Sequence, residues 1–207
     1  MHPEVLSEQA AQLFPSLSRF PDFYLAGGTA LALQLGHRVS VDFDLFCDDE
    51  VGRALLQQVR RVFVNDDLAV LVNNADELTL LLNGVKVTFL RYPFPPREPL
   101  VVYKDVRLLS VREIAATKAY TIGRRGSFKD YVDLYFVIAE KHAGLADIIA
   151  DAEAKFVSDF NSRLFLEQLV YLADLDDGEV HFIRPPVTVD DVQTFFGDRI
   201  RELSHTI

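Results

Sequence analysis

Two aspartates, Asp42 and Asp44, stand two positions apart in the otherwise apolar stretch VDFDLF. If this stretch is a strand, both carboxylates leave the same face of the sheet, about 6.5–7 Å apart. Two like charges this close repel each other unless a cation lies between them. Mg²⁺ suits such a pair, because it binds one or two carboxylates and takes its other ligands from water and substrate phosphates. The pair is a candidate metal site, although an edge strand with a solvent-facing acidic side would give the same pattern.

A Gly-Gly-Thr sequence precedes this pair. Gly27, Gly28 and Thr29 lie between a short expected strand, 23–26, and an expected helix, 29–36. Backbone amides gather at the start of a helix and bind anions there, and glycines let a phosphate approach closely. A tight turn with Thr29 as the N-cap is the simpler alternative. Together, a phosphate cradle and a metal-binding strand separated by one helix are the arrangement of a nucleotidyltransferase.

A lysine lies on the apolar side of a later helix. In the expected helix 111–122, Ile114, Lys118 and Ile122 are spaced by four, so Lys118 lies along the apolar stripe. Such a lysine must either extend its ammonium group to solvent or find an anion.

Asp130 stands three residues after Ser127, which is the pattern of a capping box at the start of a helix. Asp133, one helical turn further on, could pair with Lys129 or Arg125 and is expected to have a structural role. Arg38 could pair with Asp42, Asp44 or a phosphate group.

The elements that must position these residues divide the chain into two parts. Helices are expected at 4–20, 29–36, 50–63, 111–122, 128–141, 145–156, 161–173 and 189–203. Strands are expected at 23–26, 41–46, 68–72, 78–82 and 85–92, followed by the short runs LVVY and VRLL. Asn83-Gly84 is a favourable hairpin turn. We therefore expect an α+β core over residues 1–109 and a helical part over 110–207.

Composition limits the compartment and the partners. The 207 residues are 49% hydrophobic and 25% charged, as in ordinary globular proteins. A single cysteine, Cys47, excludes an internal disulfide, and we expect a cytoplasmic protein without a secretory signal or membrane span. The net charge of −10 disfavours extended binding to duplex DNA, but it allows a locally basic pocket or a bound metal ion.

Two sequence blocks resemble a known family. GGTALALQLGHRVSVDFDLF (27–46) looks like the first motif of the AbiEii/AbiGii-type nucleotidyltransferases, within the DNA polymerase β-like superfamily. LLSVREIAATKAYTIGRRGSFKDYVDLYFVI (108–138) is similar to that family's second block, and together the blocks cover about a quarter of the chain. The resemblance implies a polymerase β-like core and transfer of a nucleoside monophosphate from an NTP, with Mg²⁺, to an RNA or protein hydroxyl. The RNA hydroxyl could be a tRNA 3′ end, and the setting would be phage defence by a toxin with an antitoxin partner.

The resemblance also implies roles for individual residues. Asp42 and Asp44 would be catalytic metal ligands, Lys118 would contact the triphosphate, and Asp130 would be a catalytic carboxylate. The expected nucleotide-binding residues are Gly27, Gly28, Thr29, Arg38 and Lys86.

One position departs from the superfamily pattern. Polymerase β-like enzymes usually carry a third carboxylate on a following strand, where this chain has Thr88. A threonine neither adds charge at a metal nor accepts a proton well. Either Asp130 replaces the acid, or the acceptor needs no strong base, or the protein is a catalytically silent module that binds a nucleotide or a partner. Transfer to a small molecule is a further alternative, which an acidic protein would suit.

Overall fold

A computed structural model describes residues 1–52, 54–172 and 179–204. The chain divides into two compact units, Met1–Ser110 and Val111–Ile207.

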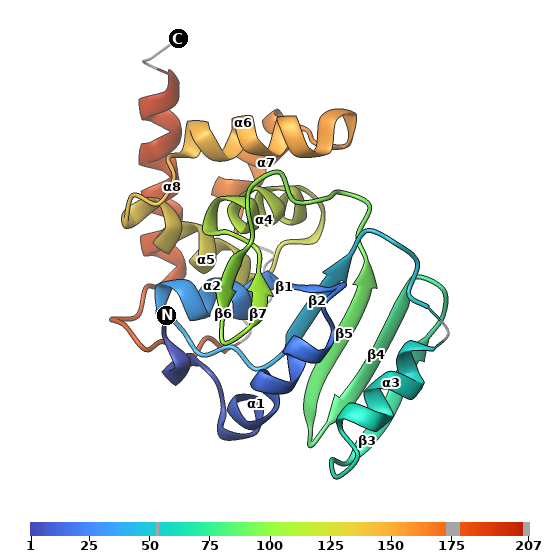
Figure 1. Cartoon of the computed structure of the whole chain (residues 1–207). Helices are drawn as coiled ribbons and strands as arrows, with labels where there is room; N and C mark the ends of the chain where they lie inside the picture. The colour runs from blue at the N-terminus through green and yellow to red at the C-terminus, as the bar shows by residue number, and fades with distance from the viewer. Residues whose placement is uncertain (53, 173–178, 205–207) are drawn as a thin grey trace. The chain divides into compact units, whose positions relative to one another are not determined.

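The first unit is built on a mixed sheet of seven strands in the order β3-β4-β5-β2-β1-β7-β6 (Figure 1). The strands are β1 (Tyr24–Ala26), β2 (Phe43–Cys47), β3 (Leu68–Asn73), β4 (Glu77–Leu82), β5 (Val85–Arg91), β6 (Val101–Tyr103) and β7 (Val106–Leu108). The β2–β5 and β1–β7 pairs are parallel, and the other neighbouring strands are antiparallel.

One face of this sheet forms the hydrophobic core. Side chains alternate along a strand, so Phe43 on β2 and Phe89 on β5 point to the same side and are fully buried. Their rings contact Phe14 and Phe20, with centroids 6.1 and 5.0 Å apart. Helices α1 (Glu8–Leu13) and α3 (Leu55–Val62) lie on the same side of the sheet (Figure 1). The other face of β2 and β5 carries the polar side chains, including Asp44.

The predicted helix 4–20 is wrong as a single element. The structure has a 3₁₀ turn η1 (Pro3–Val5), the six-residue α1 and a second 3₁₀ turn η2 (Phe14–Arg19). Ser7 begins α1 as its N-cap and accepts a hydrogen bond from the amide of Ala10. Pro15 lacks an amide proton and stands in the first turn of η2, where the α-helical pattern ends.

The strand predicted at 41–46 begins two residues later than expected, and Val41 is 48% exposed rather than buried. Strand β1 ends at Ala26, opposite Asp44, because α2 (Gly27–Leu35) begins at the next residue. No residue of β1 is therefore left to pair with Asp42. The carbonyl of Asp42 instead accepts a hydrogen bond from the hydroxyl of Thr29.

The second unit is helical in the residues that the structure describes. Its helices are α4 (Val111–Arg125), α5 (Phe128–Ala139), α6 (Leu145–Phe156), α7 (Ser162–Val170) and α8 (Val189–Ser204), with a 3₁₀ turn η3 (Val157–Asp159). Helix α4 packs on α5, α6 and α7, and α8 packs on α5 and α7. The rings of Tyr120 and Phe156 stack with centroids 4.1 Å apart at the α4–α6 contact. Residue 173, where the helix predicted at 161–173 would end, lies outside the described residues.

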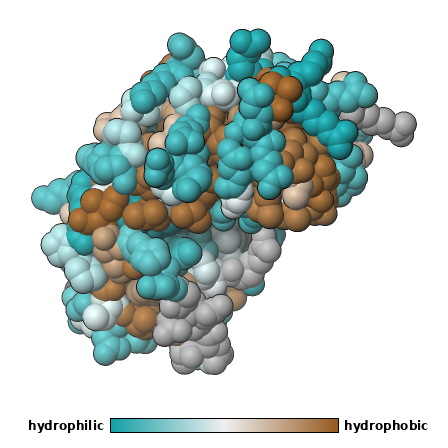
Figure 2. Space-filling view, turned by 90° about the horizontal axis from the view of Figure 1, so that it is seen from below, coloured by the Kyte–Doolittle hydropathy of each residue, from teal (hydrophilic) through white to brown (hydrophobic). Residues whose placement is uncertain are grey.

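The mixed sheet with helices, followed by further helices, confirms the predicted α+β fold class. Across the described ranges, no helix is both long enough and apolar enough to cross a membrane. Figure 2 shows apolar side chains at the surface among hydrophilic ones. Val70 and Leu71 of the sheet-edge strand β3 are two exposed apolar residues. Isolated exposed apolar residues are ordinary on folded proteins and assign no function by themselves.

Candidate active site

Asp44 lies on the polar face of β2, directly against the start of α2. Its register partner on β1 is Ala26, so the next residue along the chain, Gly27, lies close to the carboxylate. A Cβ atom at Gly27 would be 2.6 Å from Asp44 Oδ2, and the backbone there has a φ of +65°. Glycine meets both demands, since it tolerates the left-handed conformation and leaves room for the carboxylate.

The start of α2 has the features of an anion site. Its N-cap is Ala26, which has no side chain able to accept from the amides of the first turn. The guanidinium of Arg38 is buried beside Gly28, and its Nη2 would be only 2.4 Å from a Cβ atom at that position. Arg38 Nη1 donates to the carbonyl of Val39 at 3.1 Å. A buried positive charge next to a helix N-terminus favours a phosphate at this position.

Thr29 is not the N-cap of α2, so that alternative for the Gly-Gly-Thr sequence is wrong. The residue is buried inside the helix, and its Oγ1 lies 2.7 Å from Ser40 Oγ. Because its hydroxyl also donates to the Asp42 carbonyl, Thr29 ties the segment before β2 to the helix. The Thr29 side chain therefore supports the segment that carries Asp42.

Asp42 and Lys86 face each other at the margin of this region. Lys86 Nζ lies 3.9 Å from Asp42 Oδ2, and both side chains are about half exposed. Pairs this exposed contribute little to stability, so both groups can exchange partners at small cost.

Thr88 is the neighbour of Asp44 on the next strand. The two residues are register partners in the parallel β2–β5 pair. Thr88 is buried, and its hydroxyl oxygen lies 3.2 Å from that of Thr79 on β4. Thr79 donates to Glu77 Oε1 at 2.5 Å. Neither Thr79 nor Glu77 belongs to a motif that the sequence alone points to.

The second unit brings together Lys118 and Asp130. Lys118 also pairs with Asp133, for which Lys129 or Arg125 was the expected partner. Lys118 Nζ lies 2.6 Å from Asp130 Oδ1 and 2.8 Å from Asp133 Oδ2, and the Asp133 side chain is fully buried. Asp130 Oδ2 also accepts from the amide and hydroxyl of Ser127, at 2.9 and 3.0 Å. Asp130 therefore closes the predicted capping box of α5 while it binds the lysine. Burial and the nearby Asp130 carboxylate raise the pKa of Tyr131 to about 12.

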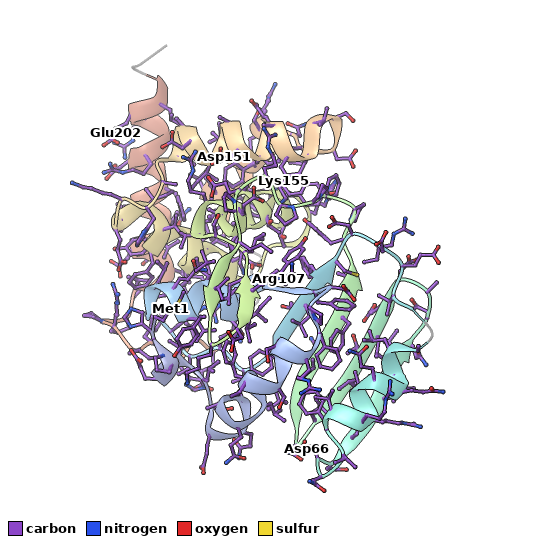
Figure 3. All side chains as sticks on the ribbon, viewed as in Figure 1. Met1, Asp66, Arg107, Asp151, Lys155 and Glu202 are labelled. Carbon is purple, nitrogen blue, oxygen red and sulfur yellow. The ribbon has the colours of Figure 1, made fainter. Side chains whose placement is uncertain are left out.

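A second pair of side chains in this unit is also buried. Lys155 on α6 donates to Glu113 on α4, with both side chains almost inaccessible to solvent. Asp151, also on α6 (Figure 3), binds Arg112 at 2.8 Å in a more exposed position. Charged residues in the second unit thus make contacts between its own helices.

The oxygen donors of the first unit fit a hard cation. Asp42, immediately before β2, and Asp44, its second residue, supply two carboxylates. Within the described ranges, no group of three or more His, Cys, Asp or Glu side chains is arranged to hold a metal. Mg²⁺ can be bound by one or two carboxylates, with waters and substrate phosphates completing its shell. This donor set therefore suits a metal that binds together with a nucleotide.

Comparison with known proteins identifies the family. The model of the nucleotidyl transferase AbiEii toxin family, described as a type IV toxin–antitoxin system, matches residues 12–199. The chain belongs to the AbiEii family. An uncharacterised protein of Aquifex aeolicus is 32% identical over 196 residues, covering 94% of each chain.

Two solved structures share the fold of this AbiEii chain. MenT4, a nucleotidyltransferase toxin of Mycobacterium tuberculosis, has a TM-score of 0.58 at 16% identity, covering 94% of this chain and 85% of its own. JHP933 from Helicobacter pylori has a TM-score of 0.54 at 17% identity, covering 97% of both chains. The predicted family and its enzyme class are confirmed: this AbiEii protein is a nucleotidyltransferase of a toxin family.

Proposed function

We propose that the protein transfers a nucleoside monophosphate from an NTP to a hydroxyl group of RNA, in a reaction that depends on Mg²⁺. The observation that carries this proposal is the approach of Asp44 to Gly27 at the start of α2. A carboxylate suited to a cation and a helix start suited to an anion lie side by side there. A metal–triphosphate complex requires that combination.

Each group in the first unit has a distinct task in this proposal. Asp42 and Asp44 would hold Mg²⁺, which supplies charge neutralisation to the phosphates. The amides of 27–29 and the Arg38 guanidinium would bind the β- and γ-phosphates. Lys86, which is half exposed, would exchange Asp42 for a phosphate oxygen.

In the reaction, an acceptor hydroxyl attacks the α-phosphorus while the bond to the bridging oxygen of the β-phosphate breaks. Pyrophosphate leaves, and the hydroxyl proton must pass to a base. Family resemblance gives Lys118 a contact with the triphosphate and gives Asp130 a catalytic role. Both remain predictions for the second unit.

The proposed acceptor is an RNA end, with the tRNA 3′ end as the first to test. A net charge of −10 opposes long contacts with a phosphate backbone, but the end of a strand needs only a short contact. The toxin family implies an antitoxin partner, whose binding would suppress the activity.

The test measures labelling of bulk tRNA with each α-labelled NTP in the presence of Mg²⁺. D44N should lower the rate about 10³-fold, because it removes a metal ligand worth several kcal/mol in the transition state. D48N is the matched control, since Asp48 is an exposed aspartate just beyond the opposite end of β2. It should label tRNA at the wild-type rate.

The alternatives predict different products in the same assay. Label on a protein or a small molecule instead of tRNA would overturn the RNA acceptor. Absence of labelling, with an NTP still raising the melting temperature in Mg²⁺, would indicate a silent nucleotide-binding module. Equal rates for D44N and wild type would overturn the metal assignment.

A further inference from the structure

The hydroxyl groups beside Asp44 form a chain that ends on a carboxylate. Thr88 is the register partner of Asp44, and Thr79 is the register partner of Thr88 on the other side. Thr79 Oγ1 lies 3.2 Å from Thr88 Oγ1 and 2.5 Å from Glu77 Oε1. These four side chains share the polar face of three adjacent strands, β2, β5 and β4.

The carboxylate determines the direction of this chain. An ionised Glu77 only accepts hydrogen bonds, so the single proton of the Thr79 hydroxyl must point to it. Thr79 then has only lone pairs to offer Thr88, and Thr88 must be the donor between them. The remaining lone pair of the Thr88 oxygen can accept a proton from a group next to Asp44.

The hydroxyl groups and the carboxylate of this hydrogen-bonded series differ in their exposure to solvent. Thr88 and Thr79 are only 9% and 5% exposed, so the hydrogen bond between them has little competition from water. Glu77 is partly exposed, so it can release a proton to solvent. The hydrogen-bonded series from Thr88 through Thr79 to Glu77 therefore leads from the proposed metal site to bulk water.

We propose that Glu77 is the general base of nucleotidyl transfer and that Thr88 and Thr79 connect it to the acceptor hydroxyl. This inference rests on the proposed function. As the acceptor oxygen bonds to the α-phosphorus, its proton moves to Thr88, the proton of Thr88 moves to Thr79, and that of Thr79 moves to Glu77. Pyrophosphate leaves with the electron pair of the broken bond, and Glu77 later releases the proton to water. Glu77 thus supplies from β4 the acid that superfamily resemblance expects at position 88.

The first measurement removes the base and the connecting hydroxyls one at a time. In the tRNA-labelling assay, E77Q, T79V and T88V should each lower kcat about 10²-fold and leave the KM for the NTP nearly unchanged. T79S and T88S keep a hydroxyl and should retain most of the activity. E98Q is the matched control, because Glu98 accepts from the Ser110 hydroxyl at 2.6 Å in the same first unit. It should have no effect on kcat.

The second measurement separates proton transfer from a structural role. T88D places a carboxylate directly beside Asp44, so the route through Thr79 is no longer needed. E77Q should then cost little in the T88D background, although it costs about 10²-fold in wild type. A structural role for Glu77 predicts the same loss in both backgrounds, and that result would overturn the proposal.

Failure of the proposed function is distinguishable from failure of this inference. A wild-type protein that labels no acceptor overturns the proposed function and the proton route together. An active wild type with unimpaired E77Q overturns the proton route alone. Melting temperatures of all variants identify any loss caused by unfolding.

Discussion

The first unit leaves Asp42 and Asp44 partly exposed at the start of a strand, whereas the second unit buries Lys118 between Asp130 and Asp133. The same kinds of charged group therefore occur in two different states. The Asp42 carboxylate of the first unit has a weak, half-exposed contact with Lys86, which it can lose at small cost. The carboxylates of the second unit are bound to a lysine whose side chain is only 11% exposed.

This difference distinguishes residues that can bind a ligand from residues that support the structure by holding another side chain in place. A group that must take up a metal or phosphate cannot already be committed to a buried partner, since breaking a buried ion pair is costly. Asp133 meets the description of a support, because it orients Lys118 from inside the helical core. Asp42 meets the description of a ligand, because its side chain is half exposed and its contact with Lys86 is long. Substitutions in the two units should therefore differ in their effects on stability and on activity.

The largest effect on stability is expected at Asp133. D133A leaves Lys118 with a reduced set of buried partners and should lower the free energy of unfolding by about 3–5 kcal/mol. D151A removes the more exposed pair with Arg112 in the same unit and should cost less than about 1 kcal/mol. Urea denaturation of both variants measures the difference. Equal losses would show that burial does not distinguish the two pairs.

An intermediate effect on stability is expected at Gly27. Substitution there should also lower the activity, unlike a substitution that causes a similar loss of stability elsewhere. G27A forces alanine into a left-handed backbone and should cost about 1–2 kcal/mol. Its Cβ would also displace Asp44 and should reduce tRNA labelling strongly. G84A is the control, because Gly84 has a similar φ of +82° and no atom within 4 Å of an added Cβ. It should lose similar stability and keep its activity.

If G27A remained as active as G84A, the close approach of Gly27 to Asp44 would have no part in catalysis. If both variants were inactive at a temperature where they are folded, the backbone strain alone would explain the loss.

Local sequence was enough to predict some of these positions. The Asn83-Gly84 turn fixes the β4–β5 register, so the Thr79–Thr88 pair could have been derived by counting outward from it. The capping box at Ser127 was likewise readable from spacing, and the structure contains it. Both depend on residues close together in the chain.

Other positions depend on tertiary structure and were not predictable. The pairing of Asp44 with Thr88 joins two parallel strands about 40 residues apart, and spacing alone does not set such a register. The burial of Asp133 against Lys118 depends on how α4 and α5 pack.

The break in the helix predicted at 4–20, by contrast, could have been predicted from the sequence, since Pro15 lies inside it.

The smallest effect on stability is expected at Asp191, a capping carboxylate of the second unit that can be compared with Asp130. Asp191 accepts from the amide and hydroxyl of Thr188 at 2.9 and 2.7 Å, as Asp130 does from Ser127, and it is fully exposed. These hydrogen bonds lower the pKa of Asp191 below its usual value, so its stabilising effect is present above pH about 4 and is lost as the pH falls. D191N should therefore melt slightly below wild type at neutral pH, and the gap should close below pH about 4. For D130N the loss at neutral pH should be larger, because Asp130 also binds Lys118. A constant gap for D191N at all pH values would show that the charge of this cap contributes nothing.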